Sequence, residues 1–336
     1  MSNVVAEEAA VSALRLVCAS PAQLEAVLTE SAEKILGVLV YSAAEPEYSA
    51  GEVPHAWVAL PVLNAKTWYE VWISPRAVVT HRDSRLSFSC DGNLLFGRLV
   101  LGDAGSEHLG RTAFAAYSSI FDLLDRMRYL ELLRLWNYFP DINGAGCGME
   151  RYREFNVGRY EAFCGKGRAI ADGMVPAACA LGTRQGPLVV CFLAGRTPGI
   201  YIENPRQTSA YRYPGDFGPR SPTFSRGVLV GDALLVSGTA SIVGSRTMHP
   251  GNVLRQLYET IENLRTVIAQ ARARGFAARD PAGLFLNVYL RHASDYQVVC
   301  GPIEAEFGGA CIAYLQADVC RADLLVEIEA FWMPAL

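Results

Sequence analysis

The segment CRADLLVEIEAFW, residues 320–332, places two carboxylic acids inside an apolar run near the end of the chain. Its composition predicts a β-strand, in which successive side chains alternate between the two faces. Glu327 and Glu329 then share one face, between Leu325 and Phe331. On residue type alone, such a face is most often solvated. The alternative is a carboxyl that is held in a partly apolar cleft, where its pKa rises and it can donate a proton.

A second reactive group, the thiol of Cys320, lies seven residues before Glu327. Taken alone, it is most simply a small buried apolar residue. The remaining cysteines and histidines form no familiar motif, because the nine cysteines include no CxxC pair and the five histidines no HxH or HExxH spacing. Glycine-rich nucleotide-binding motifs are also missing. The sequence therefore predicts neither a metal nor a cofactor.

Arginines and tyrosines gather in two stretches that are suited to binding an anion. One is ERYREFNVGR, which ends at Arg159, and the other is the irregular segment 196–223, which is rich in Pro, Tyr and Arg. Arginine suits carboxylates because its planar fork forms two parallel hydrogen bonds. The candidate binding residues are Arg153, Tyr201, Tyr211, Arg212, Tyr213, Arg220 and Arg291. A single arginine is usually a solvated surface residue, so the clustering carries the prediction.

Composition narrows the class of protein. The chain has 336 residues, of which 51% are apolar and 19% charged, so it can bury a large core. Its net charge of −4 provides no basic surface for nucleic acid. No apolar run reaches the length of a membrane span, and the acidic start does not resemble a signal peptide. We expect a cytoplasmic protein that binds neither nucleic acid nor membrane.

The order of predicted elements occurs twice. From about residue 86 the chain shows a hairpin, a helix, a strand, a second helix and two strands, and this order returns after residue 216. The spacing differs between the copies, which indicates a diverged duplication. We expect an α+β fold in which each copy is a β-sheet layer with helices on one face. The predicted domains are 1–220, which includes the linking segment 196–223, and 221–336.

The second copy resembles the RidA (YjgF) family. The motifs GPRSPTFSRGVLVGDALLVSG, LNVYLRHASDY and VEIEA follow one another in the family's order over residues 216–333, and LWNYFPDI with EFNVGRYEAF is a weaker match in the first copy. The resemblance implies two chorismate-mutase-like layers in one chain. Phe224 replaces the family's usual pocket tyrosine, and no arginine lies near Ala310, where these proteins bind a substrate carboxylate. Both departures argue against imine deamination.

Almost the whole chain resembles the chorismatases, which release the enolpyruvyl group of chorismate as pyruvate. The motifs that carry the likeness are NGAGCGMERYREFNVGR and NPRQTSAYRYPGDFGPRSPTFSRG. The resemblance makes Glu327, the first glutamate of VEIE, the catalytic acid and implies that no cofactor is needed. Glu329 either tunes Glu327 by like-charge coupling or simply reaches solvent, and we expect it to be a bystander.

Two further positions bear on the product that the resemblance implies. A cysteine at Cys320 marks the hydroxybenzoate-forming subtypes, in which it assists aromatisation. Ala240, in SGTAS, is the residue of the diol-forming subtype, whereas the 3-hydroxybenzoate subtype has glycine there. Such a mixed set suits the chorismatases of the xanthomonadin pathway, which make both 3- and 4-hydroxybenzoate.

The sequence thus predicts a chorismatase that forms pyruvate and 3-hydroxybenzoate, and that also forms some 4-hydroxybenzoate if the mixed marker set holds. The enzymatic alternative is a hydrolase that yields a dihydroxycyclohexadiene carboxylate. The alternative from another class is a RidA-like ligand-binding protein without catalysis, which would need the cations but not the acid. A monomer and a homotrimer are both open, because RidA proteins form clefts between subunits and a duplicated chain can form one internally.

Overall fold

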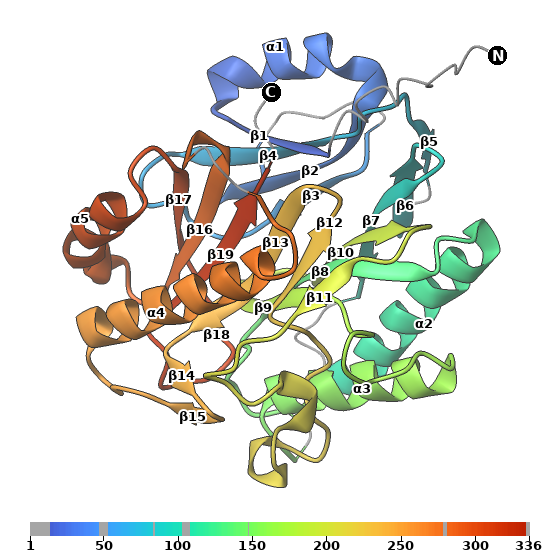
Figure 1. Ribbon diagram of the computed structural model, residues 1–336. Coiled ribbons are helices and arrows are strands. Elements are labelled where there is room, and N and C mark those ends of the chain that lie inside the picture. The colour runs from blue at the N-terminus through green and yellow to red at the C-terminus, as the bar shows by residue number, and fades with distance from the viewer. Residues whose placement is uncertain are drawn as a thin grey trace, which may run out of the picture.

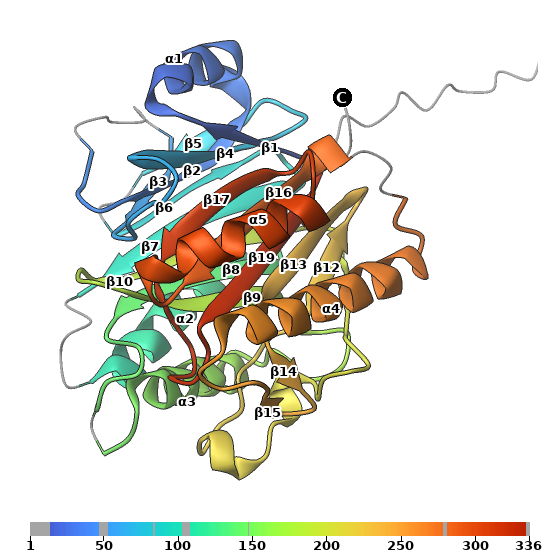
Figure 2. The same ribbon diagram turned by 90° about the vertical axis from the view of Figure 1, so that its left-hand side faces the viewer.

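Three β-sheets meet at a common core, and each is covered on its outer side by its own helices (Figures 1 and 2). The computed structural model describes residues 14–46, 53–82, 85–102, 108–146, 148–277 and 281–333. In Figure 1 the N-terminal sheet lies at the top, the sheet of the first copy at the lower right and that of the second copy at the left. The α+β fold class is confirmed.

The first copy has the predicted element order. Its elements are β6 (Leu86–Cys90), β7 (Leu94–Leu101), α2 (Leu109–Met127), β8 (Glu131–Pro140), α3 (Arg151–Gly165), β9 (Ala177–Thr183) and β10 (Leu188–Gly195). They form a seven-stranded sheet of order β18-β9-β8-β10-β7-β6-β5, in which the edge strands are β5 (Val79–His81) and β18 (Asp318–Val319). The Asp91–Gly92 turn joins β6 to β7 in the predicted hairpin, and Gly92 adopts a φ of 90°.

The second copy repeats this arrangement. Its elements are β12 (Gly227–Val230), β13 (Ala233–Ala240), α4 (Val253–Arg272), β16 (Leu284–Leu290), α5 (Tyr296–Glu306), β17 (Cys311–Gln316) and β19 (Val326–Trp332). The sheet order is β11-β12-β13-β19-β16-β17, and the added edge strand is β11 (Ile200–Ile202). A two-stranded ribbon, β14 (Ile242–Val243) with β15 (Arg246–Thr247), follows β13. The predicted duplication is confirmed.

The N-terminal sheet is a third, shortened copy, which the sequence analysis missed. Its elements are β1 (Arg15–Ala19), α1 (Pro21–Glu30), β2 (Ile35–Ser42), β3 (His55–Val58) and β4 (Thr67–Ile73). The order β1-β4-β2-β3 matches β7-β10-β8-β9 and β13-β19-β16-β17, including the one parallel pair. Within the described residues, this copy has one α-helix and no counterpart of the first hairpin strand or of the second helix, so its order of elements does not read as a repeat in the sequence.

The apolar face of α4 shows how the pattern determines the layers. Leu257, Ile261 and Leu264 recur at helical spacing and are buried against the second sheet. The side chain of Asn252 caps the helix by accepting a 3.0 Å hydrogen bond from the Arg255 amide. Helix α4 therefore covers one face of its sheet and leaves the other face to the core.

Aromatic side chains from all three sheets meet in that core. The ring centroids of Trp72 and Trp136 lie 5.2 Å apart, and Phe331 is 5.4 Å from Trp72 and 6.3 Å from Trp136. Phe331 lies on β19, two residues after Glu329. The second face of β19 is thus packed against the other two sheets, and the expectation that this face is solvated is wrong.

Strands cross the boundary that we predicted at residue 220. Strand β11 precedes that residue and joins the second copy's sheet, whereas β18 follows it and joins the first copy's sheet. The linking segment 196–223 forms β11 and two single 3₁₀ turns, η2 (Ala210–Arg212) and η3 (Gly215–Phe217). The boundary therefore stays a prediction, and the two copies are joined by exchanged edge strands.

Candidate active site

Glu327 lies on β19, on the face that is turned toward the first copy. Its neighbours Val326 and Ile328 point to the helix side, where they belong to the core under α4. In the sheet, Glu327 pairs with Ala240 of β13 on one side and with Tyr289 of β16 on the other. Strand alternation and register therefore place the predicted acid next to the predicted subtype marker.

A β-bulge in β13 makes room for the acid. The register shifts between Val236 and Thr239, and a Cβ atom on Gly238 would lie 2.1 Å from Glu327 Oε1. Arg134 of β8 donates a 3.1 Å hydrogen bond to the Val236 carbonyl, and the amide of Ala178 donates a 2.9 Å bond to Ser237 Oγ. Hydrogen bonds from the first copy therefore stabilise the bulge. Bulges beside active sites commonly change the direction of a side chain.

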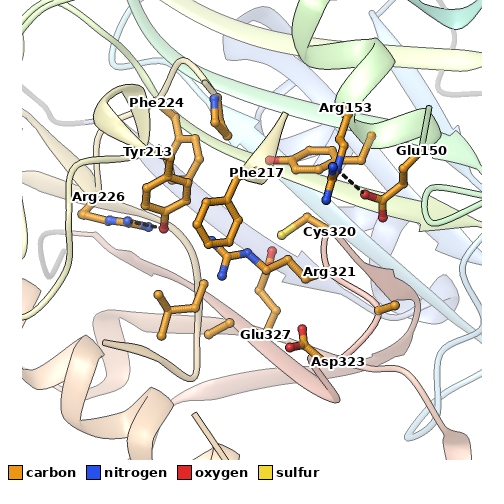
Figure 3. Close-up of a pocket in the computed structure, with 16 residues that line it drawn as sticks. Glu150, Arg153, Tyr213, Phe217, Phe224, Arg226, Cys320, Arg321, Asp323 and Glu327 are labelled. Atoms are coloured by element: carbon orange, nitrogen blue, oxygen red, sulfur yellow. Dashed lines mark hydrogen bonds and ion pairs between the residues drawn. The ribbon is translucent and has the colours of Figure 1, made fainter. Parts of the chain in front are cut away.

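Glu327 opens into a cavity of about 330 Å³ between the two copies and the linking segment (Figure 3). Its walls are Glu150, Tyr152, Arg153, Tyr213, Phe217, Pro222, Phe224, Arg226, Gly238, Ala240, Ile242, Cys320, Arg321, Ala322, Asp323 and Glu327. Figure 3 shows Glu327 and Cys320 on the same side of this space, with the rings of Tyr213 and Phe217 opposite. The cavity combines an acid, a thiol, arginines and apolar walls.

The surroundings of Glu327 favour the protonated form of its carboxyl near neutral pH. Burial and, after it, the nearby Glu329 raise its pKa from 4.5 to about 8, against the opposing effect of Arg134 and Arg226. No hydrogen bond to its carboxyl is found within the part of the chain that the structure describes. A protonated carboxyl without a fixed partner can donate its proton to a bound molecule.

Glu329 differs from the expected bystander that reaches solvent. It is fully buried, it forms an ion pair with Arg134 at 2.5 Å and it accepts a 2.9 Å hydrogen bond from the Tyr289 hydroxyl. Its charge is one cause of the raised pKa of Glu327. Of the two possibilities that the sequence left open, the structure supports like-charge coupling, because the packing of three sheets excludes solvent from this position.

Cys320 lies on the segment between β18 and β19 and faces the cavity (Figure 3). Burial and the neighbouring Glu327 raise the pKa of its thiol to about 12. The group is therefore a neutral thiol at neutral pH and not an attacking thiolate. Cys320 and Glu327 thus line the same cavity.

Two arginines that the sequence analysis missed line the cavity. Arg226 is buried, and its Nη2 donates to the Tyr213 hydroxyl at 2.9 Å and to the Thr208 carbonyl at 2.8 Å. Arg321 donates from Nη1 to the Ser245 carbonyl at 2.8 Å and stacks on Phe217, 4.2 Å from the ring centre. Arg226 Nε and Arg321 Nη2 are buried and lack a hydrogen-bond partner among the described residues. Both cations thus have donors to offer an anion.

Three of the predicted binding residues also line this cavity: Arg153, Tyr213 and Ala240. Arg153 forms an ion pair with Glu150 at 3.2 Å, and its side chain is 42% exposed, so it lies at the rim. Tyr213 is buried and packs against Phe217, with 5.3 Å between the ring centres. Of the residues predicted in the linking segment, Tyr213 alone is among the described residues that line this cavity, and its role in binding stays a prediction.

The other predicted binding residues lie outside the cavity. Tyr201 donates a hydrogen bond to the Leu132 carbonyl at 3.1 Å. Tyr211 and Arg212 both bind the exposed Asp172, and the guanidinium of Arg220 stacks on Tyr160. The linking segment winds between the two copies, so only some of its side chains point inward. Sequence spacing alone does not show which ones do so.

Arg291 supports the site instead of binding in it. Its guanidinium donates to Asp318 at 2.6 Å, to Asn143 at 3.1 Å and to three carbonyls of the segment that carries Cys320. These carbonyls belong to Val319, Arg321 and Leu324, at 2.9–3.0 Å. The expectation that Arg291 binds a substrate carboxylate is thus corrected, because its donors are taken up in holding residues 318–324.

The sequence did contain signals for the missed arginines. Arg321 directly follows Cys320, and Arg226 follows the SPTFS motif whose Phe224 we noted as a departure. For Arg321, adjacency to the reactive Cys320 was therefore the available signal. Across the described ranges, no group of three or more His, Cys, Asp or Glu side chains is placed to hold a metal ion.

Comparisons with known proteins agree with this geometry. The family model described as "Chorismatase FkbO/Hyg5-like, N-terminal" matches residues 70–194. A 3-hydroxybenzoate synthase of Streptomyces hygroscopicus is 35% identical over 89% of this chain and 92% of its own length, and a chorismatase of Streptomyces rapamycinicus is 33% identical over 88% and 92%. A crystal structure of a chorismatase covers 96% of this chain and 100% of its own, with 31% identity and a TM-score of 0.84. The chain belongs to the chorismatase family.

Proposed function

We propose that this protein is an enzyme that cleaves chorismate to pyruvate and 3-hydroxybenzoate. The observation that carries the proposal is the Glu327 carboxyl, whose pKa is raised by burial in a cavity that also holds Cys320 and two arginines with unpaired nitrogens. Relatives of similar length are a 3-hydroxybenzoate synthase and chorismatases, which supports the same reaction.

The cavity suits the substrate in charge and polarity. Chorismate carries two carboxylates on a compact apolar frame, so it needs cations beside apolar walls. Arg226 and Arg321 offer buried donors, and Arg153 at the rim adds a third cation. Phe217 and Phe224 supply the apolar walls. We assign substrate binding to these three arginines and to Tyr213.

The first step is proton transfer to carbon. Glu327 gives its proton to the methylene carbon of the enolpyruvyl group, and the ether oxygen gains positive character. The oxygen of the C4 hydroxyl then forms a bond to C3 as the bond between C3 and the ether oxygen breaks. Pyruvate leaves, and the hydroxyl proton returns to the Glu327 carboxylate. The products are pyruvate and an arene oxide, with no water consumed.

The second step is aromatisation, which we assign to Cys320. The bond between C4 and the epoxide oxygen breaks while the thiol donates its proton to that oxygen. The thiolate then takes the proton from C3, and the ring becomes 3-hydroxybenzoate. A thiol with a pKa of about 12 is a weak acid but a strong base once ionised, and the C3 proton restores it. The apolar walls limit competing attack by water.

Product analysis tests this proposal. Purified protein is incubated with chorismate in ¹⁸O-labelled water, and pyruvate release is followed with lactate dehydrogenase. The ring product is separated by chromatography, and its mass is measured by mass spectrometry. We expect one pyruvate per unlabelled 3-hydroxybenzoate, and the same run measures any 4-hydroxybenzoate. A diol as the sole ring product would establish the hydrolase, to which Ala240 pointed, and no pyruvate would establish a binding protein.

We further propose that one chain contains the complete site and works as a monomer in the cytoplasm. The cavity is formed by two copies and the linking segment of a single chain, which supports the monomer. All described cysteines are free thiols, as is usual where thiols are kept reduced. No described helix is both long and apolar enough to cross a membrane. Light scattering after gel filtration tests the monomer, and a trimer mass would contradict it.

A further inference from the structure

A second cavity, of about 240 Å³, lies between the N-terminal sheet and the sheet of the first copy. Trp57 of β3, Arg98 and Val100 of β7, and Thr183 and Val189 of the first copy line it, together with Tyr138. None of these residues takes part in the reaction proposed above. The cavity thus needs an explanation of its own.

Strand register shows that this cavity is built like the active site. Val189 pairs with Val100 and with Tyr138, as Glu327 pairs with Ala240 and with Tyr289. Val189 therefore occupies the position of the catalytic acid. Arg98 precedes Val100 by two residues, as Gly238 precedes Ala240. In this copy the acid is replaced by an apolar residue, and a cation is placed beside it.

Two polar groups in this cavity lack partners. Arg98 has neither an ion pair nor a hydrogen bond among the described residues, and its Nε is buried. The hydroxyl of Thr183, a residue that is only 7% exposed, is likewise buried without a partner within those ranges. Buried polar groups are nearly always paired, so both groups are expected to find a partner in a ligand.

The remaining walls determine what that ligand can be. Trp57, Val100 and Val189 are apolar, and the indole N–H of Trp57 is already bound to Ser42 Oγ at 3.0 Å. The exposed carboxylate of Glu45 is also part of the lining and disfavours a second negative charge. The volume suits a single ring better than a larger molecule.

We propose that this cavity is a non-catalytic binding site for a small aromatic monocarboxylate that carries a hydroxyl group. The carboxylate binds Arg98, the hydroxyl pairs with Thr183, and the ring lies against Trp57 and the two valines. Glu45 makes a dianion a poorer ligand than a monoanion. Because Val189 replaces the acid, the bound molecule is not transformed.

Titration with 3-hydroxybenzoate tests the site, and Trp57 fluorescence reports on it. The fluorescence change that is due to binding in this cavity is the part of the total change that is lost in the Trp57→Phe variant. We expect Arg98→Met to weaken the binding by about tenfold or more, since a hydrogen bond to a charged group is lost. Thr183→Val should weaken it by about two- to tenfold. Benzoate, which lacks the hydroxyl, should bind Thr183→Val as it binds the unaltered protein.

Thr183→Val keeps the test valid if Arg98→Met fails to fold, because it removes an unpaired buried hydroxyl at constant shape and should leave Tm unchanged or higher. Both variants should release pyruvate from chorismate at the normal rate, so this site and the proposed function fail independently. The proposal is overturned if 3-hydroxybenzoate causes no change in Trp57 fluorescence, or if folded Thr183→Val binds it with unaltered affinity.

Discussion

At the scale of single residues, the buried Glu327 carboxyl lowers the free energy of unfolding near neutral pH, where the enzyme is expected to work. Its pKa is about 8 in the folded protein and near 4.5 in the unfolded chain, so between these values the folded state holds more protons. Stability therefore falls as pH rises through this window. Glu327→Gln should have a higher Tm than the unaltered protein at pH 8, by about 1–2 °C for each kcal/mol recovered.

That gain should shrink toward zero at pH 4.5, where the carboxyl is protonated in the folded state and already half protonated in the unfolded chain. Thermal unfolding at the two pH values measures it. Glu70, whose pKa burial also raises to about 8, is present in both proteins and cancels in the difference. An equal Tm gain at both pH values would mean that the burial of charge is not the cause.

Gly238 provides a second test at this scale. A Cβ atom there would lie 2.1 Å from Glu327 Oε1, so Gly238→Ala must displace the carboxyl. We expect pyruvate release to fall by about tenfold or more, because small misplacements of catalytic groups are costly. Gly165→Ala is the matched control, since no atom lies within 4 Å of its added Cβ. Equal activity of the two variants would show that the acid does not need this space.

At the scale of elements, Arg291 at the end of β16 fixes the segment between β18 and β19. Arg291→Lys loses most of the five hydrogen bonds that hold residues 318–324 and Asn143. Amide hydrogen exchange in residues 318–325 should therefore rise, and the share of hydroxybenzoate should fall as Cys320 moves. Arg274→Lys is the control, since Arg274 makes one hydrogen bond to the residues that the structure describes, to the Tyr201 carbonyl. Unchanged exchange in Arg291→Lys would contradict this role.

Elements are also the level that could be predicted best from the sequence. Periodicity and turn residues gave the order of strands and helices in both copies, because each layer's amphipathic pattern is local. Which face meets another sheet is decided by packing between distant segments. For this reason the solvated face at Glu329 and the binding role of Arg291 were wrong, while Arg226 and Arg321 were missed. Glu327, Cys320 and Ala240 were placed by family motifs rather than by periodicity.

At the scale of the whole molecule, a buried ion pair joins the copies. Arg134 of the first copy binds Glu329 of the second and also the bulge at Val236. Arg134→Met leaves the Glu329 carboxylate without its partner, and we expect a loss of about 3–5 kcal/mol in the free energy of unfolding. Adding Glu329→Met should recover much of it, because the buried charge is then gone.

Denaturant unfolding of the two single variants and the double variant measures this coupling. If the losses of the single variants simply add in the double variant, the pair does not act as a unit. The Arg134 guanidinium also lies over the rings of Trp136 and Phe331, 5.2 Å and 5.4 Å from their centres, so both variants with Met at position 134 lose these contacts and the loss cancels when they are compared.

The most direct test of the central claim is pyruvate release from chorismate by Glu327→Gln at pH 7, compared with the unaltered protein. Glutamine keeps the size of the side chain but cannot donate the proton, and loss of a general acid usually costs about 10²–10⁴-fold in rate. We predict a fall of that size in kcat, with the fold intact and Tm raised. Full activity of a folded Glu327→Gln protein would contradict the assignment of Glu327 as the acid.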